Sequence, residues 1–187
     1  MRLIKTELGI VFFLTVSYIA SYAITTGFVT PLQAIILPEI SNTVSILFLP
    51  HGVRALAFYF FGIKALAYLL PGSYLMWILS VYGSDIAISP LAPITSLIAC
   101  CGGFLILQFI YKNFPRSNSF KMWRLVVLLG IITSIFNSLF LTILHSEMLS
   151  VLYVAAYLIG DMLGLIACLI IAMLIFRLIR NANQLEQ

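Results

Sequence analysis

Residues 48–72 read FLPHGVRALAFYFFGIKALAYLLPG. The stretch is apolar enough to lie in lipid, yet a proline, a histidine, a glycine and an arginine occupy positions 50, 51, 52 and 54. Charged side chains and interrupted helices are costly at membrane depth, and irregular backbone is tolerated there only inside protein or beside a water-filled cavity. We therefore expect this stretch to line a polar site within a membrane protein.

The whole chain has the composition of a membrane protein. Of its 187 residues, 63% are apolar and 9% are charged, whereas soluble domains carry about 25% charged residues. Several apolar runs reach the length of about 20 residues that crosses a bilayer as a helix. The sequence thus predicts an all-α, polytopic transmembrane helical bundle that forms a single domain over residues 1–187. We expect six spans, at about 8–29, 42–62, 65–82, 91–111, 122–144 and 150–176.

Charge placement predicts the orientation of these spans. One side of the layout receives nine of the ten basic residues, namely Arg2, Lys5, Lys64, Lys112, Arg116, Lys121, Arg124, Arg177 and Arg180. The other side receives Glu39, Asp85 and Glu147. Because basic residues are enriched on the cytoplasmic side, we expect a bacterial inner (plasma) membrane protein with cytoplasmic N- and C-termini. The net charge of +4 is explained by these topology signals, so no nucleic-acid partner is expected.

The first apolar run allows two interpretations. Its basic start, apolar middle and Ser-Tyr-Ala sequence are typical of a cleaved signal peptide. The apolar run continues through Ile24 and Phe28, however, which favours an uncleaved first span.

The second and third spans each contain residues that interrupt helices. Pro50 and Gly52 lie in the second span, and Pro71 and Gly72 lie in the third. A proline leaves the carbonyl four residues earlier without its helical partner. Paired broken helices mark binding sites in several transporters, although a packing kink without a ligand would give the same pattern. We expect both spans to be broken at these steps.

Two charged residues are expected near the bilayer midplane. Counted from the outer ends of their spans, at about 1.5 Å per residue, Arg54 and Asp161 both lie about 15 Å deep. A lone charge there is strongly unfavourable, and a guanidinium can bind a carboxylate through two parallel hydrogen bonds. We therefore expect Arg54 to face Asp161 across the bundle. The pair would either lock two helices together or open to accept a ligand or a proton.

A second polar layer is expected above this pair. His51, Asn137 and Tyr157 fall at similar depths of about 10 Å, and Ser134 shares a helix face with Asn137. These side chains would form the walls of a chamber that binds a small molecule from the outer side. His51 and His145 could hold a haem, but nothing in the sequence requires one, and the three cysteines lack the spacing of a metal site. We expect no metal, no cofactor and no enzymatic activity.

Two stretches resemble a known family. The first is Leu49-Pro50-His51-Gly52-Val53-Arg54, followed by Phe61-Gly62 and Leu70-Pro71-Gly72, and the second is Gly160-Asp161-Met162-Leu163-Gly164. They resemble the first family of membrane-associated sensor (MASE) domains of bacterial signalling proteins, over about residues 44–82 and 150–175. The resemblance implies an integral membrane sensory module, usually joined to a cytoplasmic histidine kinase or diguanylate cyclase. This chain is shorter and shows no output domain, so we expect a stand-alone bundle that signals through a partner protein at its cytoplasmic face.

A second resemblance rests on architecture. The size, the six expected spans and the cytoplasmic termini are similar to the substrate-binding S components of energy-coupling-factor vitamin transporters. That resemblance implies a subunit that binds a small molecule from the outer side. The expected function is therefore sensing or ligand binding within the lipid bilayer, with a transporter subunit as the alternative and a purely structural bundle as a third.

Overall fold

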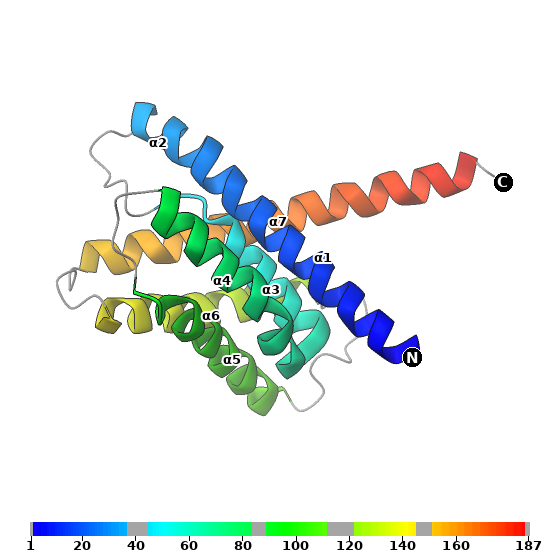
Figure 1. The fold of residues 1–187 in the computed structure, drawn as a ribbon, viewed down its shortest axis with the longest axis horizontal. Coiled ribbons are helices and arrows are strands. Elements are labelled where there is room, and N and C mark those ends of the chain that lie inside the picture. The colour runs from blue at the N-terminus through cyan, green and yellow to red at the C-terminus, as the bar shows by residue number, and fades with distance from the viewer. Residues whose placement is uncertain (1, 37–44, 84–88, 112–121, 145–150, 186–187) are drawn as a thin grey trace.

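The computed structural model describes residues 2–36, 45–83, 89–111, 122–144 and 151–185. All regular structure in these residues is helical, which confirms the all-α bundle (Figure 1). α1 (Arg2–Ile24) continues through a π-helical turn (Thr25–Val29) into α2 (Thr30–Ile36). α3 (Leu49–Phe61) leads through a 3-10 turn (Gly62–Lys64) into α4 (Ala65–Gly83), and α5 (Ala92–Ile110), α6 (Met122–Leu144) and α7 (Val151–Leu185) follow.

The described residues contain five helical stretches that are long and apolar enough to cross a membrane: Lys5–Ile36, Leu49–Gly83, Ala92–Ile110, Trp123–Phe140 and Val154–Ala182. The chain is therefore a membrane protein with multiple spans. The second stretch reverses direction at Gly62, whose φ of 61° lies in the left-handed region that favours glycine. This stretch consequently makes two passes through the bundle, α3 and α4.

Three contacts show that α3 and α4 run in opposite directions. The first backbone N–H of α3 donates a hydrogen bond to Thr25 Oγ1, directly after the end of α1 (3.2 Å). Lys64, in the turn between the two helices, lies 3.4 Å from Glu7 near the start of α1. Ser80, near the end of α4, donates a hydrogen bond to the Tyr22 hydroxyl (2.6 Å). α3 therefore runs antiparallel to α1, and α4 runs parallel to it.

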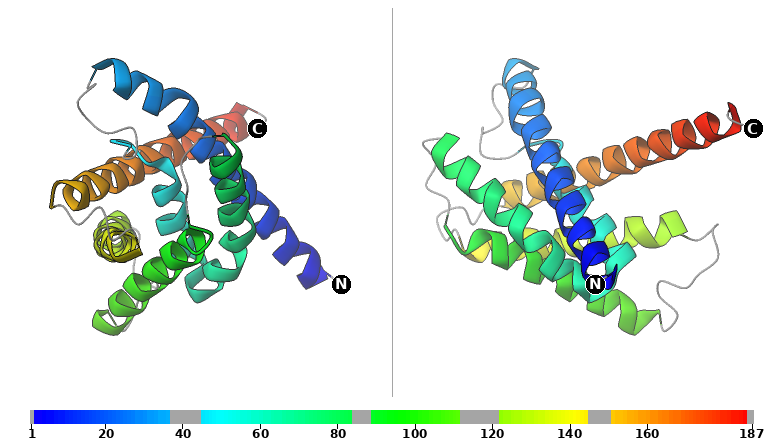
Figure 2. Two further views of the ribbon diagram at one scale, coloured as in Figure 1. Left: turned by 60° about the vertical axis from the view of Figure 1, so that its left-hand side comes forward. Right: turned by 45° about the vertical axis from the view of Figure 1, so that its right-hand side comes forward.

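α3 is the central helix of the bundle. It contacts α1, α4, α5, α6 and α7 (Figure 2), and nine of its 13 residues are buried. At about 1.5 Å per residue it is about 20 Å long, which is shorter than the hydrocarbon core of about 30 Å. The helix predicted at 42–62 is too long, because residues 45–48 are not helical and the helix begins at Leu49.

The proline and glycine steps differ from the prediction. Pro50 lies in the first turn of α3, where a helix needs no N–H, so it starts the helix and does not break it. α4 runs through Pro71, which is exposed, so the break predicted there is wrong. Gly72 instead lets α4 approach α1, because a Cβ at this position would lie 3.1 Å from Thr15 Cα and 3.3 Å from Tyr18 Cβ.

Three glycines bring the start of α3 against α7. A Cβ on Gly52 would lie 2.9 Å from the carbonyl oxygen of Gly164. A Cβ on Gly160 would collide with the carbonyl of Ser45, and one on Gly164 would collide with the carbonyl of Phe48. A side-chain rotation cannot relieve a collision with backbone. Small residues are thus required at this contact, as is typical of close helix packing in membranes.

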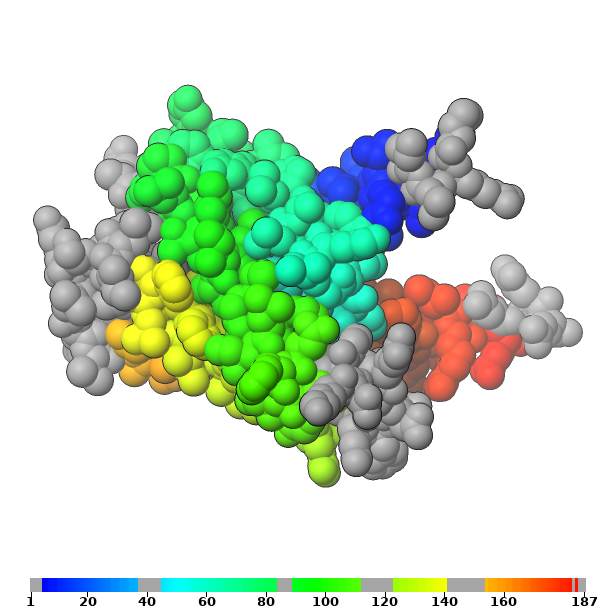
Figure 3. Space-filling model, turned by 90° about the horizontal axis from the view of Figure 1, so that it is seen from below, coloured from blue at the N-terminus to red at the C-terminus, as the bar shows by residue number. Residues whose placement is uncertain are grey.

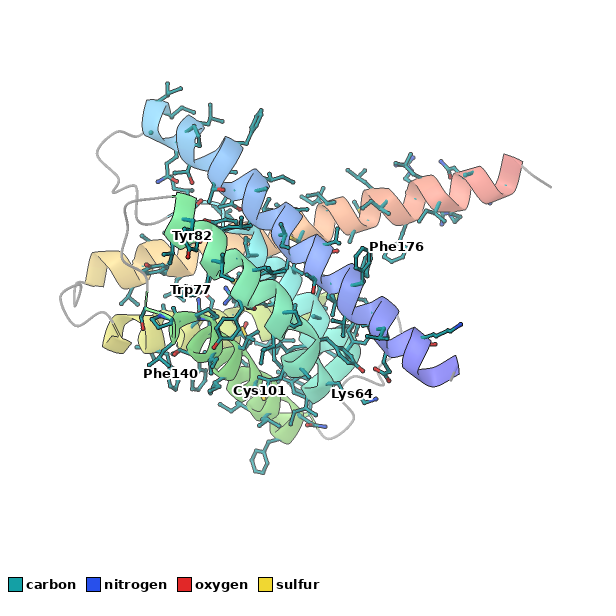
Figure 4. The ribbon with its side chains drawn as sticks, in the orientation of Figure 1. Lys64, Trp77, Tyr82, Cys101, Phe140 and Phe176 are labelled. Carbon is teal, nitrogen blue, oxygen red and sulfur yellow. The ribbon has the colours of Figure 1, made fainter. Side chains whose placement is uncertain are left out.

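α7 projects beyond the bundle. It has 35 residues and is therefore about 52 Å long. Its buried residues, where the structure describes burial, all lie between Gly160 and Cys168. Figure 3 shows the last part of α7 and the first part of α1 standing out from the body of the molecule, and Figure 4 shows Phe176 on this projecting part. Arg177 and Arg180 are exposed there.

The described basic residues outside the core gather at one end of the bundle. They lie at the start of α1, in the α3–α4 turn, at the start of α6 and at the end of α7 (Lys5, Lys64, Arg124, Arg177 and Arg180). In Figure 4, Lys64 lies at this end and Tyr82 lies at the opposite end of α4. Seven other residues named in the sequence analysis lie outside the described residues: Glu39, Asp85, Lys112, Arg116, Lys121, His145 and Glu147.

Candidate functional site: a buried polar group between α3, α5, α6 and α7

A buried carboxylate joins three helices. Asp161 of α7 is 1% exposed, and its Oδ2 atom accepts hydrogen bonds from Ser134 Oγ (3.1 Å) and Asn137 Nδ2 (3.2 Å) of α6. Asn137 Oδ1 in turn accepts a hydrogen bond from Ser96 Oγ of α5 (2.6 Å). The structure therefore brings together three of the predicted site residues, and a chain of hydrogen bonds runs from α5 through α6 to α7.

His51 brings α3 into the same group. Its ring is fully buried, and Nδ1 lies 3.3 Å from Asp161 Oδ2, an ion-pair distance without hydrogen-bond geometry. Nε2 lies 3.3 Å from the Gly130 carbonyl oxygen and 3.4 Å from Thr133 Oγ1, both on α6. A proton on Nδ1 would face the carboxylate, and a proton on Nε2 would face the carbonyl. The two ring nitrogens therefore face a carboxylate on one side and a carbonyl and a hydroxyl on the other. We call Asp161, Ser134, Asn137 and His51 the Asp161 group.

Arg54 does not pair with Asp161. Among the described residues, Asp161 has one ion-pair partner, His51, and Arg54 has none. The guanidinium is 3% exposed, lies 5.7 Å from the centre of the Phe48 ring and interacts with the side chain of Tyr18. Asp161 still acts on it electrostatically. The predicted two-pronged contact is therefore wrong, although both charges are buried in one core.

The register between α3 and α7 explains why the partner differs. The Phe48 N–H donates a hydrogen bond to the carbonyl of Gly160, which precedes Asp161 (2.9 Å). Both helices run in the same direction, and Gly164 lies against Phe48 and Leu49, so Asp161, three residues earlier, lies before the first residue of α3. His51 follows two residues later, about 3 Å along the helix, whereas Arg54 lies about 7.5 Å along it. The histidine is thus the nearer partner for the carboxylate.

Protein groups satisfy the non-helical backbone before α3. The Ile46 N–H donates a hydrogen bond to Gln33 Oε1 (2.8 Å), and the Leu49 N–H donates one to Thr25 Oγ1 (3.2 Å). The Leu49 carbonyl accepts a hydrogen bond from Cys168 Sγ (3.3 Å). Irregular backbone at membrane depth needs polar partners, and Gln33, Thr25 and Cys168 supply them here.

The remaining predicted residues have unequal roles. Tyr157 is half-buried on α7, one turn before Asp161. Pro50 and Gly52 support the site indirectly, because one starts α3 and the other lets α3 meet α7. Gly72 faces α1 and does not contact the Asp161 group.

Sequence reasoning missed Ser96 and Thr133. Thr133 lies four residues before Asn137 on α6, so its place on the same helix face could have been recognised from spacing. Ser96 follows Thr95 in the apolar run of α5, and no pattern distinguishes it from that neighbour.

The Asp161 group suits proton binding and the recognition of polar ligands. A carboxylate, an amide and a hydroxyl lie within one hydrogen-bonding network, an imidazole lies at ion-pair distance from the carboxylate, and all four are shielded from solvent. Within residues 2–36, 45–83, 89–111, 122–144 and 151–185, no set of three His, Cys, Asp or Glu side chains could hold a metal ion.

Comparison with known proteins identifies no relative. The chain matches no protein-family model, no curated protein and no solved structure.

Proposed function

We propose that this chain is a sensor-like integral membrane protein, which detects a small ligand or another stimulus in its polar core and relays the signal to a partner protein. In this proposal it lies in a bacterial inner membrane with both termini in the cytoplasm. The observation that carries the proposal is the position of Asp161. This buried residue holds the polar group together, and it belongs to the helix that projects from the bundle.

The packing of the two stretches that carry the MASE resemblance is a second support for the proposal. The two stretches that resemble the family, around Gly52 and Gly164, are far apart in the sequence and pack against each other in the structure. A change at Asp161 would therefore alter the contact between the two stretches. Because the contact is made by backbone against backbone, α3 and α7 cannot shift independently without breaking it.

The projecting part of α7 is the route by which the signal would leave the core. A ligand or a proton that changes the hydrogen bonds of Asp161 would move α7 relative to α6, which supplies Ser134 and Asn137. The exposed Arg177 and Arg180 would move with the helix and change their contact with a partner at the cytoplasmic face.

The transporter-subunit alternative has less support. It requires a chamber that opens to the outer side, whereas Asp161, His51 and Arg54 are each no more than 3% exposed. A binding site that is closed in this way is better suited to a response inside the bundle than to the transfer of a solute.

Photocrosslinking in native membranes tests the proposed function. Benzoyl-phenylalanine in place of Arg180 should form an adduct with the partner protein. The matched control is the same probe at Phe109, which is 87% exposed near the end of α5. The substitution Asp161→Asn should change the adduct yield at position 180, because it removes the charge that holds α7 in place.

The same experiment contains the outcomes that would reject the proposal. If position 180 gives no adduct beyond that of position 109, α7 does not contact a partner. If an adduct forms but its yield does not depend on Asp161, the polar core does not control that contact.

A further inference from the structure

Arg54 is a buried cation without a close counter-charge among the described residues. Its Nε atom is buried and has no hydrogen-bond partner there. Its neighbours Phe48, Tyr18 and Cys100 carry no formal charge. The carboxylate that acts on it, Asp161, is already held by three other groups. A buried charge is strongly unfavourable unless it is paired, so this guanidinium points to a missing acceptor.

Two other buried groups, on the neighbouring helices α1 and α4, also lack hydrogen-bond partners in the described part of the chain: Thr15 Oγ1 and Ser73 Oγ. Thr15 lies three residues before Tyr18 on α1. Ser73 follows Gly72, where an added Cβ would lie 3.3 Å from Tyr18 Cβ. Tyr18 also interacts with Arg54, so the three unpaired groups belong to three helices, α1, α3 and α4, that meet at Tyr18.

The chemistry of these three groups favours a negatively charged ligand. Each of the three can donate a hydrogen bond, and one carries a positive charge. We propose that Arg54 binds a small carboxylate or another small oxyanion between α1, α3 and α4, with Thr15 and Ser73 as further donors. A guanidinium fork matches two oxygen acceptors. This inference rests on the proposed function, for which it names the chemical class of the ligand.

The packing around Arg54 limits the ligand to a few atoms. Ala55 and Phe58, which neighbour Arg54 on α3, are fully buried in the hydrophobic core. Cys100 of α5 also lies close enough to act on Arg54 electrostatically, and it is fully buried as well. A large organic molecule would have to displace these side chains, so the proposed ligand is limited to the size of acetate.

Charge balance links this site to the Asp161 group. Arg54 and Asp161 carry opposite charges in one core, so a bound anion adds a negative charge that the membrane interior disfavours. A proton on His51 balances it. The groups that face His51 are Arg54 on α3, the Gly130 carbonyl and Thr133 hydroxyl on α6, and Asp161 on α7. If anion binding is accompanied by proton uptake at His51, whose ring lies 3.3 Å from the Asp161 carboxylate, anion binding should become tighter as the pH falls.

Thermal unfolding of the full chain in detergent micelles tests this inference. The probes are acetate and phosphate, and chloride at the same ionic strength is the reference. A ligand that binds only the folded state raises the melting temperature in a saturable manner. We expect this rise with acetate, phosphate or both, and we expect Arg54→Gln to abolish it.

Two serine variants on α4 form a matched pair that does not depend on Arg54. Ser73→Ala removes a proposed donor, and the half-saturating anion concentration should rise about two- to tenfold, the effect of one hydrogen bond. Ser80→Ala removes a buried hydroxyl whose partners are Met76 and Tyr22, and it should leave the anion response unchanged.

Three results would overturn the inference. They are a response to chloride equal to that of both oxyanions, no response to any anion, and equal responses of the two serine variants.

Acetate titrations at about pH 8 and about pH 6 test whether a proton binds together with the anion, because acetate stays charged over this range. Equal affinities at the two pH values would overturn the link to His51. Since no partner protein is needed, an anion response without an adduct at position 180 would reject the sensor function and keep the anion site.

Discussion

One added methyl group at Gly164 should destabilise the contact between α7 and the start of α3. In Gly164→Ala the new Cβ would collide with the carbonyl of Phe48 and lie 3.0 Å from the backbone nitrogen of Leu49. These are backbone atoms, so α3 must move away from α7. That movement weakens the hydrogen bond from Phe48 to Gly160 (2.9 Å) and disturbs the surroundings of Asp161.

The expected magnitude is the balance of three effects. Overpacking costs about 1–3 kcal/mol, and the weakened hydrogen bond costs up to about 0.5–1.5 kcal/mol. Alanine gains about 0.5–1 kcal/mol over glycine inside a helix. The free energy of unfolding should therefore fall by about 1–3 kcal/mol. Gly102→Ala in α5 is the matched control, because its Cβ would meet nothing within 4 Å and only the helix gain applies.

Denaturant unfolding in one micelle system, followed by circular dichroism, measures both variants. Gly102→Ala should be more stable than the wild type, and Gly164→Ala should be less stable. If Gly164→Ala is as stable as the wild type, α3 and α7 do not meet at this glycine. If both variants lose the same stability, the loss does not come from the contact, and the argument fails.

Three further substitutions can be measured in the same assay. Asp161→Ala leaves its donors without their shared acceptor and should cost about 3–5 kcal/mol; a near-neutral result would show that the carboxylate does not hold the group together. Ser134→Ala removes one hydrogen bond to a charged acceptor and should cost about 1.5–3 kcal/mol, so a more stable variant would contradict the 3.1 Å contact. Gly62→Ala places a side chain at a φ of 61° and should cost about 1–3 kcal/mol, and an unchanged unfolding curve would argue against the reversal there.

Much of the fold could be predicted from hydropathy, because a backbone in lipid must satisfy its own hydrogen bonds and therefore forms helices. The start of α3 could not be predicted in this way. Residues 45–48 are as apolar as a helix would be, and their non-helical backbone is supported by Gln33, Thr25 and Gly160, which lie far away in the sequence. Pro71 misled the prediction for the opposite reason, since an exposed proline can remain within a continuous helix.

The sequence could predict which residues form the candidate site, but not which of them pairs with the Asp161 carboxylate. Counting residues along each span estimates depth, and this was enough to place His51, Asn137 and Asp161 within one polar core. The partner of the carboxylate depends on how far α3 is displaced along α7. That displacement is set by Gly164 and its contact with the backbone before α3, and no property of Arg54 itself reveals it.

The length of α7 has a mechanical consequence. From Asp161 the helix continues to Leu185, a distance of about 36 Å. A stiff rod of this length that pivots by about 5° at Asp161 carries its tip about 3 Å sideways. An adjustment of tenths of an ångström beside the carboxylate is thereby amplified into a displacement large enough to break a hydrogen bond at the far end.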